Sequence, residues 1–248
     1  MIINIPNYNS PLTVEKRKKV TSTNDILKEY ALNGLDNYVL IANEQTGGRG
    51  RYNRYYYSPK DSGIYFSILL RPNIDRSIYP LITPICAVAV CEAINEYGID
   101  ASIKWVNDII VKDKKVCGIL VETILSDNPA IVIGIGLNLF PPKKGFPEDI
   151  KDKAGSIFDT KKNVKNVIVQ KVINNFFKYY TNLNSKDYVT YYKDHCKTIG
   201  EKVKVIDVNG NEKDCIAKEL TDNLELVIEN LDGSTEIIRT GEATIIPQ

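Results

Sequence analysis

Residues 101–139 read ASIKWVNDIIVKDKKVCGILVETILSDNPAIVIGIGLNL, and the strands predicted in this stretch indicate how the chain folds. It contains four runs with the β-branched composition typical of strands, at 101–106, 108–112, 115–125 and 130–139. Short connections at Asp113-Lys114 and at Asp127-Asn128-Pro129 join the last three runs, as tight hairpins do. Because hairpins join antiparallel neighbours, the stretch predicts consecutive strands of an antiparallel or mixed sheet.

Helical patterns flank these strands on both sides. Apolar residues at helical spacing predict four helices: from near Asn24 to Gly34, over 78–97, from Val164 onward, and over 186–195. Pro84 marks either the start of the second helix or a kink in it. Further strands are predicted at 39–42 and 63–70, and a loop at 140–162. This order predicts an α+β fold, in which helices cover a mixed, largely antiparallel sheet.

The chain changes character after Gly200. Short strand-like runs follow, with turn residues at 209–211 and 232–234, and they describe a small all-β module. We therefore predict two domains, 1–198 and 199–248.

Composition excludes several classes of protein. The 248 residues include 32 basic and 31 acidic side chains, so net charge gives no general attraction to nucleic acid or membranes. No apolar run approaches the roughly 20 residues of a membrane span, and the first residues are unlike a signal peptide. Five cysteines without a Cys-x-x-Cys pair predict reduced thiols in a cytoplasmic protein. His195 is the only histidine and has no partners at ligand spacing, which argues against a metal site there.

Gly47-Gly48-Arg49-Gly50-Arg51 is a basic glycine loop after a predicted strand. Glycines let the backbone approach an anion closely, and two guanidinium groups can close over it. Such a loop is also common as a solvated turn, so its meaning depends on the neighbouring motifs.

Four other blocks accompany the loop in a fixed order. They are Thr21-Ser22-Thr23-Asn24, Lys104-Trp105-Val106-Asn107-Asp108, Lys115 to Glu122, and Gly134-Ile135-Gly136-Leu137-Asn138. In this order and spacing the set resembles the biotin protein ligases, from about residue 20 to the C-terminus. The resemblance implies that the chain activates biotin with ATP and Mg²⁺ to biotinyl-5′-AMP. It further implies transfer of biotin to a lysine of a biotin carboxyl carrier domain, and an SH3-like barrel for the C-terminal module.

The resemblance also assigns roles to residues. It implies that biotin is bound by Ser22, Thr23, Asn24, Gln45, Gly48, Arg49, Gly50, Arg51, Lys115 and Gly118. It implies that ATP is bound by Arg49, Arg54, Tyr56, Lys104, Asn107, Asp108 and Asn138. Lys115 and Arg51 are the expected catalytic residues, and Asp108 is the expected Mg²⁺ ligand because hard cations prefer carboxylate oxygen. Taken alone, Ser22 or Thr23 would be read as a helix cap, and Lys115 as an exposed hairpin lysine.

The sequence departs from the family pattern at three places. Val106 stands where the family has proline, and Tyr56 stands where it usually has a tryptophan that packs on adenine. Ala243-Thr244-Ile245-Ile246 replaces a segment in which many relatives carry an arginine, which puts a basic contact from the C-terminal domain to ATP in doubt.

Two other functions compete with this interpretation. A lipoate–protein ligase shares the chemistry, but the glycine-arginine loop after Gln45 favours biotin, whose ureido ring needs paired polar contacts. Arginines beside Tyr55-Tyr56-Tyr57 could also bind single-stranded nucleic acid, although the near-zero net charge argues against it. Only 21 residues precede Ser22, too few for a helix-turn-helix domain, so we expect the single-function form without DNA binding. The resemblance allows a homodimer through a sheet edge.

Overall fold

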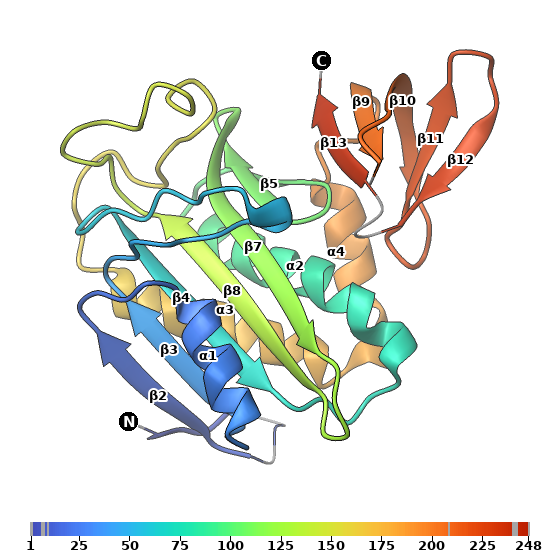
Figure 1. Ribbon diagram of the computed structural model, residues 1–248. Coiled ribbons are helices and arrows are strands. Elements are labelled where there is room, and N and C mark those ends of the chain that lie inside the picture. Colours follow the sequence, from blue (N-terminus) through green and yellow to red (C-terminus); the bar gives the residue numbers. More distant parts are fainter. Residues whose placement is uncertain (1, 6–7, 9, 208, 240–242, 248) are drawn as a thin grey trace.

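In the computed structural model, which describes residues 2–5, 8, 10–207, 209–239 and 243–247, an eight-stranded sheet forms the centre (Figure 1). Its order is β1-β2-β3-β4-β8-β7-β6-β5. The strands are β1 (Ile2–Ile3), β2 (Leu12–Arg17), β3 (Tyr38–Ala42), β4 (Gly63–Leu70), β5 (Ala101–Lys104), β6 (Asp108–Val111), β7 (Lys114–Ile124) and β8 (Ala130–Asn138). Among the strands that the structure describes in this sheet, only β2 and β3 pair in parallel; the other neighbours are antiparallel. The predicted mixed, largely antiparallel sheet is confirmed.

Two details of the sheet differ from prediction. The hairpin between β6 and β7 turns at Lys112 and Asp113, not at Asp113-Lys114. Both turn residues have positive φ values, 50° and 60°, as the commonest two-residue hairpin turn requires. Strand β2 was not predicted, although Leu12 and Val14 are buried and Thr13 is exposed in the alternation that marks a strand.

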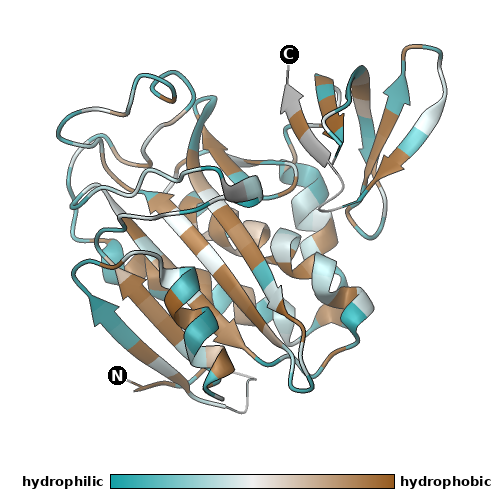
Figure 2. Cartoon of the chain, viewed as in Figure 1, coloured by the Kyte–Doolittle hydropathy of each residue, from teal (hydrophilic) through white to brown (hydrophobic). Residues whose placement is uncertain are grey.

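Helices cover both faces of the sheet. The first helix, α1 (Thr23–Leu32), lies on one face, over β3, β4 and β8. On the other face lie α2 (Ile82–Asn95), α3 (Lys165–Tyr180) and α4 (Asp187–His195), and the largest hydrophobic core fills the space between them and the strands. Hydrophobic residues follow the strands and α2 accordingly (Figure 2). The four predicted helices are confirmed.

The ends of α1 and α2 follow from local chemistry. The Ser22 hydroxyl accepts a hydrogen bond from the backbone N–H of Asp25, so Ser22 caps α1, and Gly34 ends it at φ 84°. A 3₁₀ helix, η2 (Arg76–Leu81), precedes α2. Pro84 therefore falls in the first turn of α2, where a missing N–H removes no helical hydrogen bond.

The combined helix Arg76–Asn95 has the length and mean hydropathy, 1.7, of a membrane span. This differs from the expectation that no segment would approach that length. However, 72% of its apolar window is buried inside the fold, against the sheet and against α3 and α4. Its hydropathy is that of a core helix.

A second sheet follows α4 (Figure 1). Its antiparallel order is β12-β11-β10-β9-β13, formed by β9 (Lys202–Asp207), β10 (Glu212–Leu220), β11 (Leu226–Asn230), β12 (Thr235–Ile238) and β13 (Ala243–Pro247). This all-β architecture agrees with the predicted SH3-like module. Trp105 joins it to the first sheet, because the indole N–H donates to the Leu224 carbonyl at 2.9 Å.

Candidate active site

The site is a cavity of about 860 Å³ on the α1 side of the sheet. The predicted site residues that line it are Ser22, Thr23, Asn24, Gln45, Arg49, Gly50, Arg51, Arg54, Tyr56, Lys104, Asn107, Asp108, Lys115, Gly118 and Asn138. Gly48 is the one predicted residue outside this lining, and it lies close to two residues of the lining, Gln45 and Tyr56. Five blocks that are far apart in the sequence thus meet at one place.

One end of the cavity is polar and uncharged. The side-chain oxygen of Gln45 accepts from the backbone N–H of Thr23 at 2.8 Å and from its hydroxyl at 3.0 Å. The Gln45 amide nitrogen donates to Ser58 at 3.2 Å. A Cβ at Gly48 would lie 2.5 Å from the Tyr56 carbonyl and 2.6 Å from the Ser58 hydroxyl, so this close approach requires glycine.

Asn24 lines the cavity and also forms several hydrogen bonds within the protein. Its amide nitrogen donates to Glu122 at 2.8 Å and to the Leu120 carbonyl at 3.3 Å. Its oxygen accepts from the buried Ser67 hydroxyl at 2.6 Å. Because Asn24 lines the cavity, a direct contact from Asn24 to biotin stays a prediction beside these contacts within the protein. Ser58 and Ser67 were missed by the sequence analysis, although Ser67 is a lone serine in the otherwise apolar or aromatic strand GIYFSILL.

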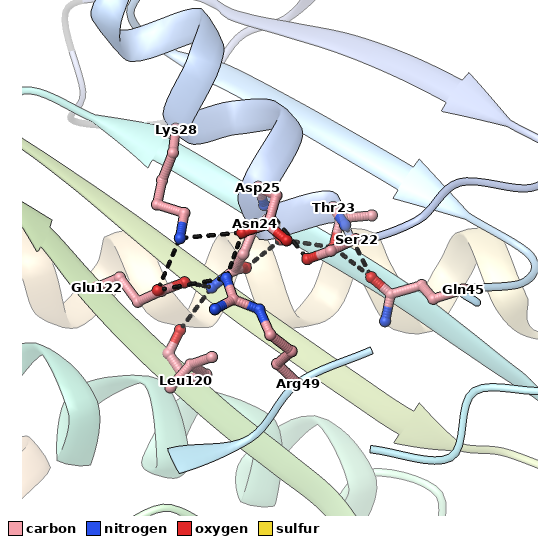
Figure 3. Close-up of polar contacts among 10 residues, drawn as sticks. Ser22, Thr23, Asn24, Asp25, Lys28, Gln45, Arg49, Leu120 and Glu122 are labelled. Carbon is pink, nitrogen blue, oxygen red and sulfur yellow. Dashed lines mark hydrogen bonds and ion pairs between the residues drawn. The ribbon is translucent and has the colours of Figure 1, made fainter. Parts of the chain in front are cut away.

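Four charged groups meet at the start of α1 (Figure 3). Arg49 forms ion pairs with Asp25 and, at 3.6 Å, with Glu122. Lys28 reaches the same two carboxylates, at 3.0 Å and 2.9 Å. Burial opposes the charge of Lys28, but its hydrogen bonds to Glu122 and Asp25 outweigh burial and raise its pKa.

The glycine-arginine loop folds back on itself. The backbone N–H of Gly50 donates to the Arg54 carbonyl at 2.8 Å, and that of Tyr56 donates to the Gly48 carbonyl at 2.9 Å. Between them lies a single 3₁₀ turn, η1 (Arg51–Asn53). The Arg51 guanidinium lies 5.2 Å from the centre of the Tyr52 ring. The loop thus forms a short flap beside the cavity.

A glycine pair forms the floor under Tyr56. Gly118 on β7 and Gly136 on β8 are directly paired, and a Cβ on either would overlap the Tyr56 ring. The Tyr56 hydroxyl donates to the Gly136 carbonyl at 2.7 Å. Burial raises the pKa of Tyr56 well above its usual value, so it remains an uncharged donor.

A β-bulge aims Lys115 into the cavity. The pairing of β6 with β7 shifts by one residue at Val116, and both Val116 and Cys117 are buried in the core. Lys115 and Gly118 consequently share the cavity face. The Lys115 ammonium lies 2.6 Å from a carboxylate oxygen of Asp108. Lys114 is exposed and does not line the cavity.

Positive charge gathers at this end. Burial lowers the pKa of Lys104, and the nearby charges of Lys115, Lys153 and Arg54 lower it further, while Asp108 opposes them. Lys153 was not predicted; it comes from the 140–162 loop, whose backbone pairs with Lys115 at 2.8 Å. The cavity can therefore hold a ligand with a neutral polar head at one end and an anionic group at the other.

Two residues predicted to contact the nucleotide, Asn107 and Asn138, also contribute to the fold. The Asn107 amide donates to the Ile119 carbonyl at 2.8 Å, and Asn138 is buried at the end of β8. Trp105 is buried and lines the cavity, and its peptide bond to Val106 is cis. Ile245 of β13 lines the cavity, whereas the side chains of Ala243, Thr244 and Ile246 lie outside the described residues.

The described lining of the cavity contains no cysteine and no histidine. All five cysteines are free thiols, four of them buried, and burial raises the pKa of Cys91 to about 12. The His195 ring stacks on Tyr191 with 3.9 Å between ring centres. Among the described residues, no group of three or more His, Cys, Asp or Glu side chains could enclose a metal ion.

Comparison with known proteins gives a consistent result. Residues 16–138 match the model of the Biotin/lipoate A/B protein ligase family. The bifunctional ligase/repressor BirA of Bacillus subtilis is 37% identical over 142 residues, which are 56% of this chain and 44% of that protein. The chain therefore matches less than half the length of that relative. The biotin–[acetyl-CoA-carboxylase] ligase of Mycobacterium tuberculosis is 26% identical over 233 residues, covering 89% of this chain and 84% of that protein.

A solved structure has a similar fold. The biotin protein ligase from Aquifex aeolicus in complex with biotin and ATP superposes with a TM-score of 0.79 and 27% sequence identity. The match covers 95% of this chain and 99% of that one, so the similarity includes both sheets.

The lowered pKa of Lys104 predicts a pH effect on anion binding. Lys104 loses its proton below the ordinary lysine pKa of 10.5, so pyrophosphate affinity should fall as pH rises through that lower value. Lys104→Arg should keep its charge and bind pyrophosphate over a wider alkaline range. Isothermal titration calorimetry from pH 7 upward would measure this, with Lys114→Arg as the control. Identical pH profiles for wild type and Lys104→Arg would contradict the role of Lys104 in anion binding.

Proposed function

Because the chain belongs to the biotin/lipoate A/B protein ligase family, we propose that it is a biotin protein ligase. It activates biotin with ATP to biotinyl-5′-AMP and then transfers biotin to a lysine of a biotin carboxyl carrier domain. The observation that carries this proposal is the cavity itself. It joins the neutral polar end at Thr23 and Gln45 to the cationic end at Lys104 and Lys115.

The first step joins two anions. An oxygen of the biotin carboxylate attacks the α-phosphorus of ATP, and the bond from that phosphorus to the bridging oxygen breaks, releasing pyrophosphate. Two like charges ~4 Å apart repel by about 4 kcal/mol at an effective dielectric constant near 20. Lys115, Arg49 and Arg51 offset this repulsion, and Thr23 with Gln45 orients the ureido ring at the far end.

The second step consumes the adenylate. The amine of the acceptor lysine attacks the acyl carbon, the acyl–oxygen bond breaks and AMP leaves with the phosphate oxygen. The acyl phosphate must be kept from water until the amine arrives. The flap over 47–57 serves this purpose in our proposal, with Tyr56 seated on Gly118 and Gly136 as its inner wall.

We propose that Mg²⁺ arrives with ATP. The described residues offer no cage of three acidic or metal-ligating side chains, but Mg²⁺ commonly binds substrate phosphates and only one or two carboxylates. Asp108 fits that single-carboxylate role, because it lies at the cationic end, where it pairs with Lys115. Magnesium bound there would neutralise phosphate charge.

The biological setting is also part of the proposal. The acceptor is a carboxylase biotin domain or carrier protein, and the free, buried thiols suit a cytoplasmic location. We assign the catalytic domain to residues 1–198 and the SH3-like domain to 199–248, with a homodimer formed through a sheet edge.

The activity itself is the first prediction from this proposal. The protein should exchange labelled pyrophosphate into ATP when biotin is present, and not with lipoate or with neither acid. Folded protein that exchanges with lipoate alone would support a lipoate ligase instead. Folded protein without biotin-dependent exchange would refute the proposal.

Lys115 should be the residue whose loss slows adenylation most. Removing one preorganised charge contact to a transition state typically lowers rates ~10²–10³-fold, so we expect that loss for Lys115→Ala, with weaker biotin binding. Lys115→Arg should not restore activity, because a bulky guanidinium replaces a compact charge. Lys114→Ala is the matched control and should retain the rate. The rate of adenylate formation in a single turnover measures the effect of each substitution. Equal rates in the two alanine variants would mean that Lys115 is not the lysine that supports adenylation.

Arg51 should retain the adenylate. Arg51→Gly removes a guanidinium and adds backbone freedom to the flap, so reactive adenylate should escape and label lysines of bystander proteins. The measurement is biotin incorporation into serum albumin, compared with wild type at equal adenylate production. Hydrogen exchange over 47–57 should also slow when biotin is added to the wild type. Adenylate formation without bystander labelling would contradict this role.

Specific DNA binding should be absent from residues 1–248. Lys16, Arg17, Lys161, Lys162 and Lys165 line a second cavity of about 500 Å³, so we expect weak association with polyanions that salt abolishes. Fluorescence anisotropy with operator and random duplexes at two salt concentrations measures this. Nanomolar, sequence-dependent binding at physiological salt would overturn the expectation.

A further inference from the structure

Glu122 is a partly buried carboxylate on β7 to which the proposed chemistry assigns no role. Its oxygens receive the Asn24 amide at 2.8 Å and the Lys28 ammonium at 2.9 Å, and lie 3.6 Å from the Arg49 guanidinium (Figure 3). Asn24 and Lys28 belong to α1, and Arg49 belongs to the flap. One side chain on the sheet therefore holds both of the elements that frame the cavity.

The sheet below Asn24 fixes the orientation of its side-chain amide toward Glu122. A Cβ at Gly134 would overlap the Asn24 side chain, so the asparagine rests on bare backbone. The Ser67 hydroxyl holds the amide oxygen at 2.6 Å. Because a carboxylate only accepts hydrogen bonds, the amide nitrogen must face Glu122. The orientation of Asn24, next to the Thr23–Gln45 end of the cavity, is thus set from both sides.

Arg49 is held by one edge of its guanidinium. One terminal nitrogen faces both Asp25 and Glu122, whereas its Nε is buried without a hydrogen-bond partner in the part of the chain that the structure describes. Arg49 also lines the cavity, so a shift of its guanidinium toward a bound oxyanion would give this buried donor an acceptor. The carboxylates hold one terminal nitrogen of the arginine and leave the Nε–H without an acceptor among the described residues.

From these contacts we propose that Glu122 is a positioning residue for the biotin end of the site. It fixes Asn24 and Arg49 together and so seats the flap against α1, without touching either substrate. This proposal rests on the proposed ligase function. Asp25 cannot replace Glu122, because it would then face the two cations of Lys28 and Arg49 alone and makes no contact with Asn24.

Glu122→Gln tests the role with little change of shape. A charge-assisted hydrogen bond sets a scale of ~10–100-fold, so we expect the KM for biotin to rise at least tenfold. The KM for ATP should rise by a smaller factor than the KM for biotin, because Arg49 is the only expected ATP contact that Glu122 holds, whereas Lys104, Arg54 and Lys115 are untouched. Glu122→Asp keeps the charge and should recover part of the loss. Glu29→Gln is the matched control, since it neutralises an exposed acid on α1 outside this cluster.

Hydrogen exchange separates the proposal from the ligase function. Without any substrate, amides of residues 49–56 should exchange faster in Glu122→Gln than in wild type or Glu29→Gln. If wild type lacks biotin-dependent exchange of pyrophosphate, the proposed ligase function is wrong, while the hydrogen-exchange measurement still tests the positioning role of Glu122.

Equal rises in the KM values for biotin and ATP, together with a lower melting temperature, would show that Glu122 only stabilises the fold and would overturn the proposal. Unchanged flap exchange would also overturn it. Should Glu122→Gln not fold, Glu122→Asp takes its place, because its shorter side chain withdraws the carboxylate from Asn24 and Arg49. Flap exchange should then be faster than in wild type, and unchanged flap exchange in that variant would overturn the proposal.

Discussion

The site depends on one stretch of sheet surface that lacks side chains. Gly118, Gly134 and Gly136 expose backbone on the α1 face of β7 and β8, and a Cβ at any of them would meet Asn24, Tyr56 or Lys115. Most strands in this sheet are covered by branched side chains, which would hold a helix and a flap farther away. The glycines let polar groups approach the backbone closely. In exchange, each glycine loses more conformational entropy on folding than another residue would. Both the neutral end and the cationic end are built on this surface.

Charge is balanced before any ligand arrives. Asp108 pairs with Lys115, and Asp25 and Glu122 pair with Arg49 and Lys28. Unpaired cations crowded in a partly buried cavity would lose hydration and repel each other; burial first, and then the neighbouring cations, lower the pKa of Lys104 in this way. These carboxylates are only partly buried, so the pairs can open without the large penalty of a fully buried ion. A phosphate or carboxylate ligand can therefore replace them as the partner of the cations.

Much of the site could be predicted because it lies in short blocks with local signals. A capping serine, a glycine-arginine loop and a strand ending in Asn138 each have a pattern that is visible within a few residues. The missed residues have no such pattern. Ser58 contributes through Gln45, Ser67 through Thr23 and Asn24, and Lys153 comes from an irregular loop. Their roles depend on partners that are distant in sequence.

The sequence alone accounted for most of the elements and for their amphipathic faces, because periods of two and 3.6 residues reflect local backbone geometry. It also identified the family, since five blocks keep their order and spacing. Tertiary structure alone decided the parallel pairing of β2 with β3 and the bulge at Val116 that turns Lys115 toward the cavity. It alone turned Asn24 toward Glu122 and seated Tyr56 on two glycines. Register, bulges and hydrogen-bond partners are set by contacts between segments that are far apart along the chain, and local periodicity carries no information about which segments will meet.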